Sequence, residues 1–362
     1  MRHQNVPFRE RSVGHPVYGA EIVPKIGRVI MPVVVADDRA IIQDSADILD
    51  YFEERNLGKY SIVPKNPILR AIAHLFEFFG GEGMVRPLMH YRWSFDADNL
   101  PLTKSFFADM SPATASAQEL EEMFEFASGR MRGATSAFGV APETMKDIEA
   151  TSEDFLQRFD AHLAESSFLL GGHATIGDFG LAIPLYAHLS RDAYPGSLMK
   201  RIAPRVFKWV ERLNGSETYE DHRVSWQSEE LFAPDTVPET LKDLMRYVAE
   251  EYLPEISAHV AYANHWLAER PEIQPGTNGL EDPAQRGIGM AEFNWRGHDI
   301  QTAVMPYRFY LLQRLTDGFA QAGDADQKEI RALFVETGLE TILDLRTTRR
   351  VERANHLEVW GE

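Results

Sequence analysis

Asp44 and Ser45 are the residues of this chain best suited to bind a small polar ligand. They directly precede apolar side chains at helical spacing, Ile48, Leu49 and Phe52, so we expect one of the two to cap a helix. The free N–H groups at a helix N-terminus and the helix dipole together attract an anion. The pair therefore predicts either a cap alone or a cap that also binds a ligand.

Two short strands are expected directly before this helix. Val33–Val35 and residues 40–42 are β-branched or apolar, and the polar turn 36–39 between them favours a β-hairpin. Pro32 precedes the first strand, either as a trans proline at a strand start or with a cis bond. In the cis case the turn leaves the peptide of Met31 open as an edge to which an extended peptide can pair.

The elements around this hairpin follow from similar local signals. Residues 6–13 are expected to form one more strand, and Asn66-Pro67 predicts the start of a helix because Asn caps well and Pro fits the first helical position. Thr175 and Asp178 have the spacing of a capping box, which we interpret as structural only. Further helices are expected over 116–137, 142–165, 176–190 and 204–213.

The last third of the chain follows a polar connector at 214–237. An amphipathic helix from Leu241 to Tyr252 is expected to kink or end at Pro254, and the composition of 270–287 predicts a loop. The remaining expected elements are a strand within 289–297, helices over 299–321 and 324–338, and a final strand over 351–360.

Composition excludes several classes of function. The 362 residues contain no cysteine, which rules out disulfides, thiolate metal sites and a cysteine nucleophile within the chain. A net charge of −18 repels phosphate backbones and anionic membrane surfaces, so neither nucleic acid nor a membrane is an expected partner. No apolar run is long enough for a membrane helix or a signal peptide, and we expect a cytoplasmic protein of two or three domains.

With these elements in place, residues 1 to about 230 resemble the cytosolic glutathione transferase superfamily. Three motifs carry the resemblance: 30–34 (IMPVV), 43–51 (QDSADILDY), and 168–172 (FLLGG) followed by 175–179 (TIGDF). The resemblance implies an α/β plus all-α fold. It places a truncated thioredoxin-like glutathione-binding domain at 1–64, an all-helical glutathione transferase domain at 66–232, and a mostly helical extension of unknown role at 238–362.

The resemblance also implies glutathione as cosubstrate and assigns residues to it. The Met31-Pro32 edge, with its proline cis, pairs with the cysteinyl part of the tripeptide. Ser45 and its N–H take the γ-glutamyl carboxylate, and Asp44 faces the ammonium group. Arg28 or Lys25 meets the glycyl carboxylate. An acid beside the helix N-terminus suits a zwitterion better than a bare anion.

The implied reaction is attack of the glutathione thiolate on a hydrophobic electrophile, and the implied assembly is a homodimer. The family's first strand and helix, which carry the catalytic Tyr, Ser or Cys, have no counterpart before Asn5. We therefore expect Met1 to be an internal methionine of a longer chain and leave the catalytic residue unassigned, because Ser12 and Tyr18 come too late in the fold. The alternatives are a non-catalytic binding or scaffold protein of the same fold, and a dehalogenase or disulfide reductase.

Other side chains offer weaker candidates. The twelve histidines include no pair at the spacing of a helical zinc motif, so no metal site is expected. Six residues could form a binding face for the hydrophobic substrate: His74, Phe78, Met89, His90, Tyr91 and Trp93. The alternative is that they are core residues, because aromatic residues at helical spacing more often belong to a core.

Overall fold

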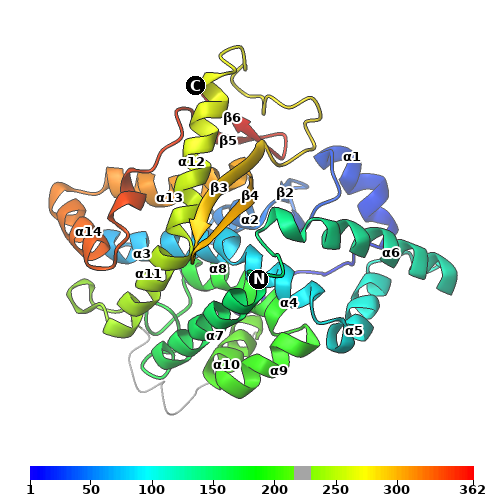
Figure 1. Cartoon of the computed structure of the whole chain (residues 1–362), viewed down its shortest axis with the longest axis horizontal. Coiled ribbons are helices and arrows are strands. Elements are labelled where there is room, and N and C mark those ends of the chain that lie inside the picture. Colours follow the sequence, from blue (N-terminus) through cyan, green and yellow to red (C-terminus); the bar gives the residue numbers. More distant parts are fainter. Residues whose placement is uncertain (216–229) are drawn as a thin grey trace.

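The computed structural model describes residues 1–215 and 230–362, and this part of the chain is mostly helical with three two-stranded antiparallel sheets (Figure 1). The α-helices are α1 (Val23–Ile26), α2 (Ser45–Glu54), α3 (Pro67–Phe78), α4 (Val85–Trp93), α5 (Asp96–Asp109), α6 (Ala117–Gly133), α7 (Met145–His162), α8 (Ile176–Pro184), α9 (Ala193–Ile202), α10 (Pro204–Asn214), α11 (Glu239–Glu251), α12 (Leu253–Ala268), α13 (Pro306–Gln321) and α14 (Asp324–Glu336). The strands are β1 (Val33–Val35), β2 (Ile41–Gln43), β3 (Gly289–Trp295), β4 (His298–Val304), β5 (Val351–Ala354) and β6 (Leu357–Trp360).

Short 3₁₀ and π-helical segments complete the described chain. The 3₁₀ segments are η1 (Arg2–Gln4), η4 (Thr135–Ala137), η6 (Pro234–Thr236) and η7 (Glu340–Asp344). The π-helical segments are η2 (Tyr18–Ile22), η3 (Phe79–Gly83) and η5 (Leu185–Leu189). η3 extends α3 and η5 extends α8, so both helices run on through a wider turn.

The predicted N-terminal hairpin is confirmed, with β1 antiparallel to β2 and Val34 opposite Ile42. The strand expected over 6–13 is wrong, because these residues pair with no strand in the described chain. Pro7 lacks a backbone donor, and a lone extended segment has no ladder in which to place its N–H and C=O groups. No thioredoxin-like sheet forms among the described residues, and the helical stretch from η2 into α1 follows instead.

The helical region begins where the sequence predicts it. The Asn66 side chain accepts hydrogen bonds from the N–H groups of Ile68 (2.9 Å) and Leu69 (3.1 Å), which caps α3. α8 packs against the end of α3 so closely that a Cβ added at Gly80 would lie 2.4 Å from the Gly180 carbonyl carbon. Glycine is required there because any side chain would separate the two backbones.

The expected helices of the middle region are present as α6, α7, α8 with η5, and α10. Pro254 interrupts the next helical stretch as predicted, since α11 ends at Glu251 and Pro254 lies in the first turn of α12. Residues 270–287 form a loop, also as predicted. Within the predicted connector, residues 216–229 lie outside the described part of the chain.

Two predictions for the C-terminal region are wrong in part. The helix expected over 299–321 begins only at Pro306, because β4 precedes it and buries alternate side chains, Ile300, Thr302 and Val304. This period of two is typical of a strand with one buried face. The strand expected over 351–360 is a hairpin, β5–β6, that turns at Asn355 and His356, where φ is 50° and 64°.

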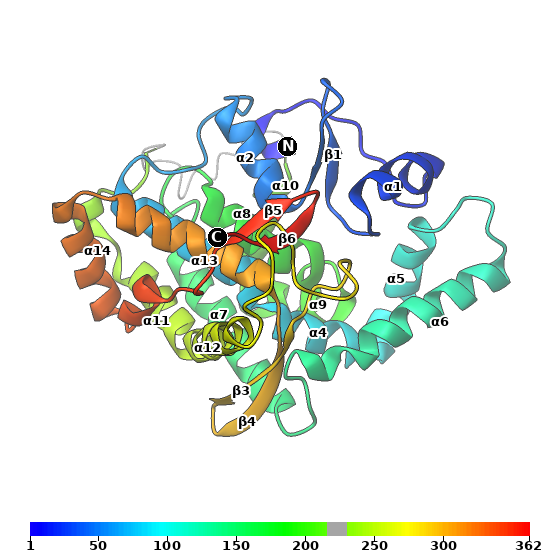
Figure 2. The ribbon, with the colours of Figure 1, turned by 90° about the horizontal axis from the view of Figure 1, so that it is seen from above.

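One apolar core runs through the described chain from Ala46 on α2 to Trp360 on β6. α13 lies beside α2 and α3, and the β5–β6 hairpin lies next to α2 (Figure 2). The predicted C-terminal extension therefore packs onto the predicted glutathione-binding region. None of the described helices is both long and apolar enough to cross a membrane.

Candidate functional site

Asp44 caps α2 with its side chain, which confirms the prediction that either Asp44 or Ser45 caps this helix. Its Oδ1 accepts a hydrogen bond from the Ala46 N–H at 2.9 Å, and its own N–H donates to the Pro32 carbonyl at 3.3 Å. The φ of Asp44 is 100°, a conformation that residues other than glycine rarely adopt and that surrounding contacts must maintain. This arrangement places the N-terminus of α2 beside the Met31-Pro32 peptide, which is cis as the resemblance implies.

The Met31-Pro32 edge is open to solvent. Met31 is 57% exposed and Pro32 is also exposed. Within residues 1–215 and 230–362, nothing forms a hydrogen bond with the N–H or C=O of Met31. The Tyr18 hydroxyl fixes the preceding residue instead, by donating to the Ile30 C=O (2.7 Å) and accepting from the Ile30 N–H (2.9 Å). A rigidly held peptide edge is thus available next to Asp44.

Asp44 is covered by a residue from the C-terminal region. The Tyr307 hydroxyl, at the start of α13, donates a hydrogen bond to Asp44 Oδ1 at 2.7 Å. Asp44 is only 9% exposed as a result. Burial raises the pKa of the Asp44 carboxyl, and the hydrogen bond from Tyr307 partly offsets this.

Arg28, predicted to meet a glycyl carboxylate, binds a carboxylate of the chain itself. Its guanidinium donates to Glu358 on β6 (3.2 Å), to Gln43 Oε1 (3.2 Å) and to the His356 C=O (2.8 Å). Burial alone would raise the pKa of Glu358, but its contacts with Arg28 and Arg353 hold it below the ordinary value. Lys25, the other residue considered, is exposed in the last turn of α1.

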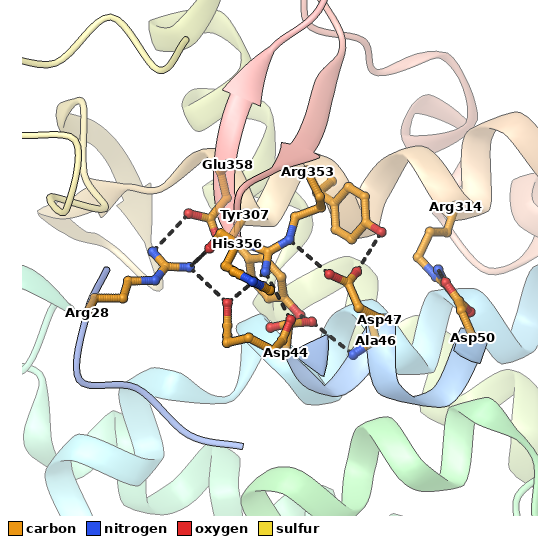
Figure 3. Close-up of polar contacts among 12 residues, drawn as sticks. Arg28, Asp44, Ala46, Asp47, Asp50, Tyr307, Arg314, Arg353, His356 and Glu358 are labelled. Carbon is orange, nitrogen blue, oxygen red and sulfur yellow. Dashed lines mark hydrogen bonds and ion pairs between the residues drawn. The ribbon is translucent and has the colours of Figure 1, made fainter. Parts of the chain in front are cut away.

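Arg353 joins the C-terminal hairpin to α2. It donates to Asp47 Oδ2 at 3.1 Å and to Gln43 Oε1 at 2.8 Å, and it is paired with Glu358. Figure 3 shows this guanidinium between Asp47 and Glu358, with Arg28 on the far side of the same carboxylate. The hairpin therefore presents a cation to α2 and an anion to Arg28.

α2 and α13 meet through matched polar side chains (Figure 3). Acids at three-residue spacing, beginning with the N-cap residue of α2, face donors on one side of α13, in the same order along both helices. The pairs are Asp44 with Tyr307 (2.7 Å), Asp47 with Tyr310 (2.9 Å), and Asp50 with Arg314 (2.5 and 2.7 Å). We call these six residues the polar seam. Sequence reasoning missed the α13 side of it, although the spacing of Tyr307, Tyr310 and Arg314 is a usable signal for one helical face.

The residues considered for a hydrophobic substrate face do not form an open surface. His74, Phe78, His90, Tyr91 and Trp93 are buried, and Met89 is half-buried. His74 forms a hydrogen bond with Glu77 at 2.7 Å, and Phe78 and Tyr91 belong to the continuous core. The alternative that these side chains are core residues is correct.

A second polar cluster lies fully inside the protein, between α4, α12 and α13. Arg308 donates to Glu82 (3.2 Å), to Glu255 (2.5 Å) and to His259 Nδ1 (3.0 Å), while Arg86 donates to Glu255 (2.5 Å). Burial lowers the pKa of His259 to about 3, so its ring is neutral at pH 7. None of these side chains is more than 8% exposed, so they connect helices rather than meet a ligand.

The rest of the described chain adds no metal centre, since it contains no group of three or more His, Cys, Asp or Glu side chains able to hold an ion. Comparison of the chain with protein-family models, curated proteins and solved structures finds no match. Function must therefore be inferred from the geometry around α2.

Proposed function

We propose that this protein is glutathione transferase-like and binds glutathione between the Met31-Pro32 edge and the N-terminus of α2. In this proposal residues 1–64 keep only the β1–β2 hairpin and α2 of a thioredoxin-like domain, 66–232 are the helical domain of that family, and 238–362 are an added region. The location is cytoplasmic. A homodimer is the proposed assembly.

The observation that carries the proposal is the hydrogen bond from the Asp44 N–H to the Pro32 carbonyl. It holds a helix N-terminus, a carboxylate and an exposed, unpaired peptide edge within one small region. A tripeptide with an ammonium group, carboxylates and a backbone of its own matches these three features. Met31 would pair with the cysteinyl backbone, and Ser45 and Asp44 would take the γ-glutamyl end.

The proposed reaction is attack of the glutathione thiolate on a hydrophobic electrophile. This chemistry requires a hydroxyl or thiol that lowers the pKa of the bound thiol, and no described residue is assigned that role. Tyr18 is close to the edge, but both of its hydroxyl hydrogen bonds go to Ile30.

A non-catalytic binding or scaffold protein is the second candidate. The burial of Asp44 beneath Tyr307 favours it, because a group used internally is less available to a cosubstrate that must exchange at every turnover. Glutathione conjugation of an aryl halide, measured beside binding, separates the two candidates. Binding with turnover supports the transferase, and binding without turnover supports the scaffold.

Calorimetric titration with reduced glutathione tests the binding itself. The wild-type chain is expected to bind, and the double variant Asp44→Ala/Ser45→Ala is expected to bind at least about tenfold more weakly, since a lost charged contact is worth about 1.5–3 kcal/mol. Ser116→Ala is the matched control, because Ser116 caps α6, a helix distant from α2. Equal affinity of the wild type and the double variant, or no binding by the wild type, contradicts the proposal.

A further inference from the structure

The C-terminal region offers the site around α2 the same chemical groups that the proposed ligand would bring. Glu358 brings a carboxylate to Arg28, and Arg353 brings a cation to Asp47 and Gln43. Tyr307 brings a donor to Asp44. The hairpin and the first turn of α13 thus take the places that a zwitterion's anionic and cationic ends would take.

These contacts are incompatible with a ligand at the same atoms. Asp44 Oδ1 already accepts two hydrogen bonds, from Ala46 and Tyr307, and the residue is 9% exposed. Arg28 is also 9% exposed and engaged by Glu358. Met31, in contrast, is 57% exposed and has no hydrogen bond to its peptide groups in the described chain. The proposed site is therefore open at Met31 and closed at Asp44 and at Arg28.

We propose that Tyr307 and Glu358 are internal competitors that limit the affinity of this site for glutathione. The inference rests on the function proposed above and names the regulation of the same site. A ligand enters along the Met31 edge, and its ammonium group reaches Asp44 Oδ1 only when the Tyr307 hydroxyl leaves. Its glycyl carboxylate reaches Arg28 only when Glu358 leaves.

The movement required is local. Phe309, Leu312 and Leu315 anchor α13 in the core at 0–2% exposed, so the helix as a whole stays in place. The Tyr307 side chain sits at the first turn of α13, under the half-buried guanidinium of Arg286, 5.6 Å from its ring centre. Tyr307 is itself 6% exposed and packs in the core, so freeing Asp44 requires its side chain to leave a buried position while α13 stays in place.

Tyr307→Phe tests the first competitor, because it removes the hydroxyl and keeps the ring that packs in the core. Glutathione is expected to bind about tenfold more tightly to this variant, the value of one hydrogen bond to a charged group. Tyr310→Phe is the matched control: its hydroxyl donates to Asp47 one helical turn further along α2, and its loss is expected to leave glutathione affinity unchanged.

Glu358→Gln tests the second competitor, and it still tests the inference if Tyr307→Phe does not fold. This variant is expected to bind glutathione several-fold more tightly than the wild type. Its affinity for glutathione whose glycyl carboxylate is converted to an amide is expected to be the same as that of the wild type. Tyr307→Phe is expected to tighten binding of both ligands equally, because Asp44 faces the other end. Circular dichroism of each variant confirms the native helical content before titration.

The outcomes distinguish this inference from the function on which it rests. If the wild type binds glutathione and neither Tyr307→Phe nor Glu358→Gln binds it more tightly, internal competition is wrong and the binding site stands. Weaker binding by Tyr307→Phe also overturns the inference, since it makes Tyr307 a ligand contact. If neither the wild type nor the variants bind, the proposed function fails and the competition fails with it.

Discussion

Tyr307 donates a hydrogen bond to Asp44 over 2.7 Å, although 263 positions separate the two residues in the sequence. This contact fixes the first turn of α13 against the first turn of α2. It also explains why a carboxylate at a helix N-terminus, where solvent access is usual, is almost fully buried. The C-terminal region is thus part of the environment of the proposed glutathione site, not an independent attachment.

The capping box of α8 is expected to be essential for folding. Asp178 accepts hydrogen bonds from the N–H groups of Leu169 (2.9 Å) and Thr175 (2.8 Å) and from the Trp209 indole (3.0 Å). The Thr175 hydroxyl also donates to Asp178 (3.1 Å), so Asp178→Ala removes the acceptor of four buried donors, and a loss of about 3–5 kcal/mol in the free energy of unfolding is expected. Urea denaturation followed by circular dichroism measures it.

Glu119→Ala is the control for this variant, because Glu119 completes a capping box of the same type on the surface, at α6. Its loss is expected to be much smaller, since water replaces the carboxylate. Similar losses for the two variants would show that burial of the Asp178 cap adds nothing.

Arg308 is expected to hold its cluster together. Arg308→Met leaves Glu82 and Glu255 buried with fewer positive partners, and breaking such a buried pair costs about 3–5 kcal/mol. Arg331→Met removes an exposed arginine that pairs with Asp344, so a much smaller change is expected. The measurement is the urea midpoint of each variant, and an unchanged midpoint for Arg308→Met would contradict the assignment.

Two glycine-to-alanine substitutions are expected to change the stability of the protein in opposite directions. Gly180→Ala places a Cβ 2.4 Å from Glu77 Cα, so the α3–α8 contact must open at a cost of about 1–3 kcal/mol. Gly318, inside α13, has open space around the same position, and Gly318→Ala is expected to stabilise by about 0.5–1 kcal/mol. Thermal unfolding of both variants decides this, and stabilisation by Gly180→Ala would refute the close approach of the two helices.

Stability is expected to fall as the pH decreases from 7 to 5. Burial lowers the pKa of His162 to about 4 and that of His259 to about 3, both below the ordinary 6.5 of the unfolded chain. The unfolded state therefore takes up protons first, and each histidine costs the native state about 2 kcal/mol by pH 5. The full stability is present above about pH 6.5.

Urea unfolding at pH 7, 6 and 5 measures this dependence. Burial also lowers the pKa of His188 to about 3, so three histidines contribute, and His259→Gln is expected to reduce the slope between pH 6 and 5 by about a third. His265→Gln is the control because the His265 side chain is 74% exposed and is expected to leave the slope unchanged. A wild-type stability that is constant from pH 7 to 5 would mean that the fold does not keep these three rings neutral.

Local chemistry made part of this structure predictable. Asn66 and Asp44 each contact N–H groups within three residues, so their caps follow from the sequence alone. The β1–β2 hairpin and the break at Pro254 are local in the same sense. These elements need no knowledge of what packs against them.

Contacts between distant segments were not predictable in this way. The polar seam requires α2 and α13 to lie side by side, and no short-range pattern specifies that pairing. The sequence of β4 predicts the start of a helix because Ile300 and Val304 also fit helical spacing, while the partner strand β3 selects the extended form. The expected strand over 6–13 failed for the converse reason, since no strand of the described chain pairs with it.

The most direct test of the proposed site is to follow backbone amide resonances of the isotopically labelled chain during titration with reduced glutathione. The account predicts that the largest shifts fall on Met31, Ser45 and Ala46, and that the amide of Ser116 at the N-terminus of α6 does not move. Shifts confined to other regions, or no shifts at glutathione concentrations in the millimolar range, would contradict it.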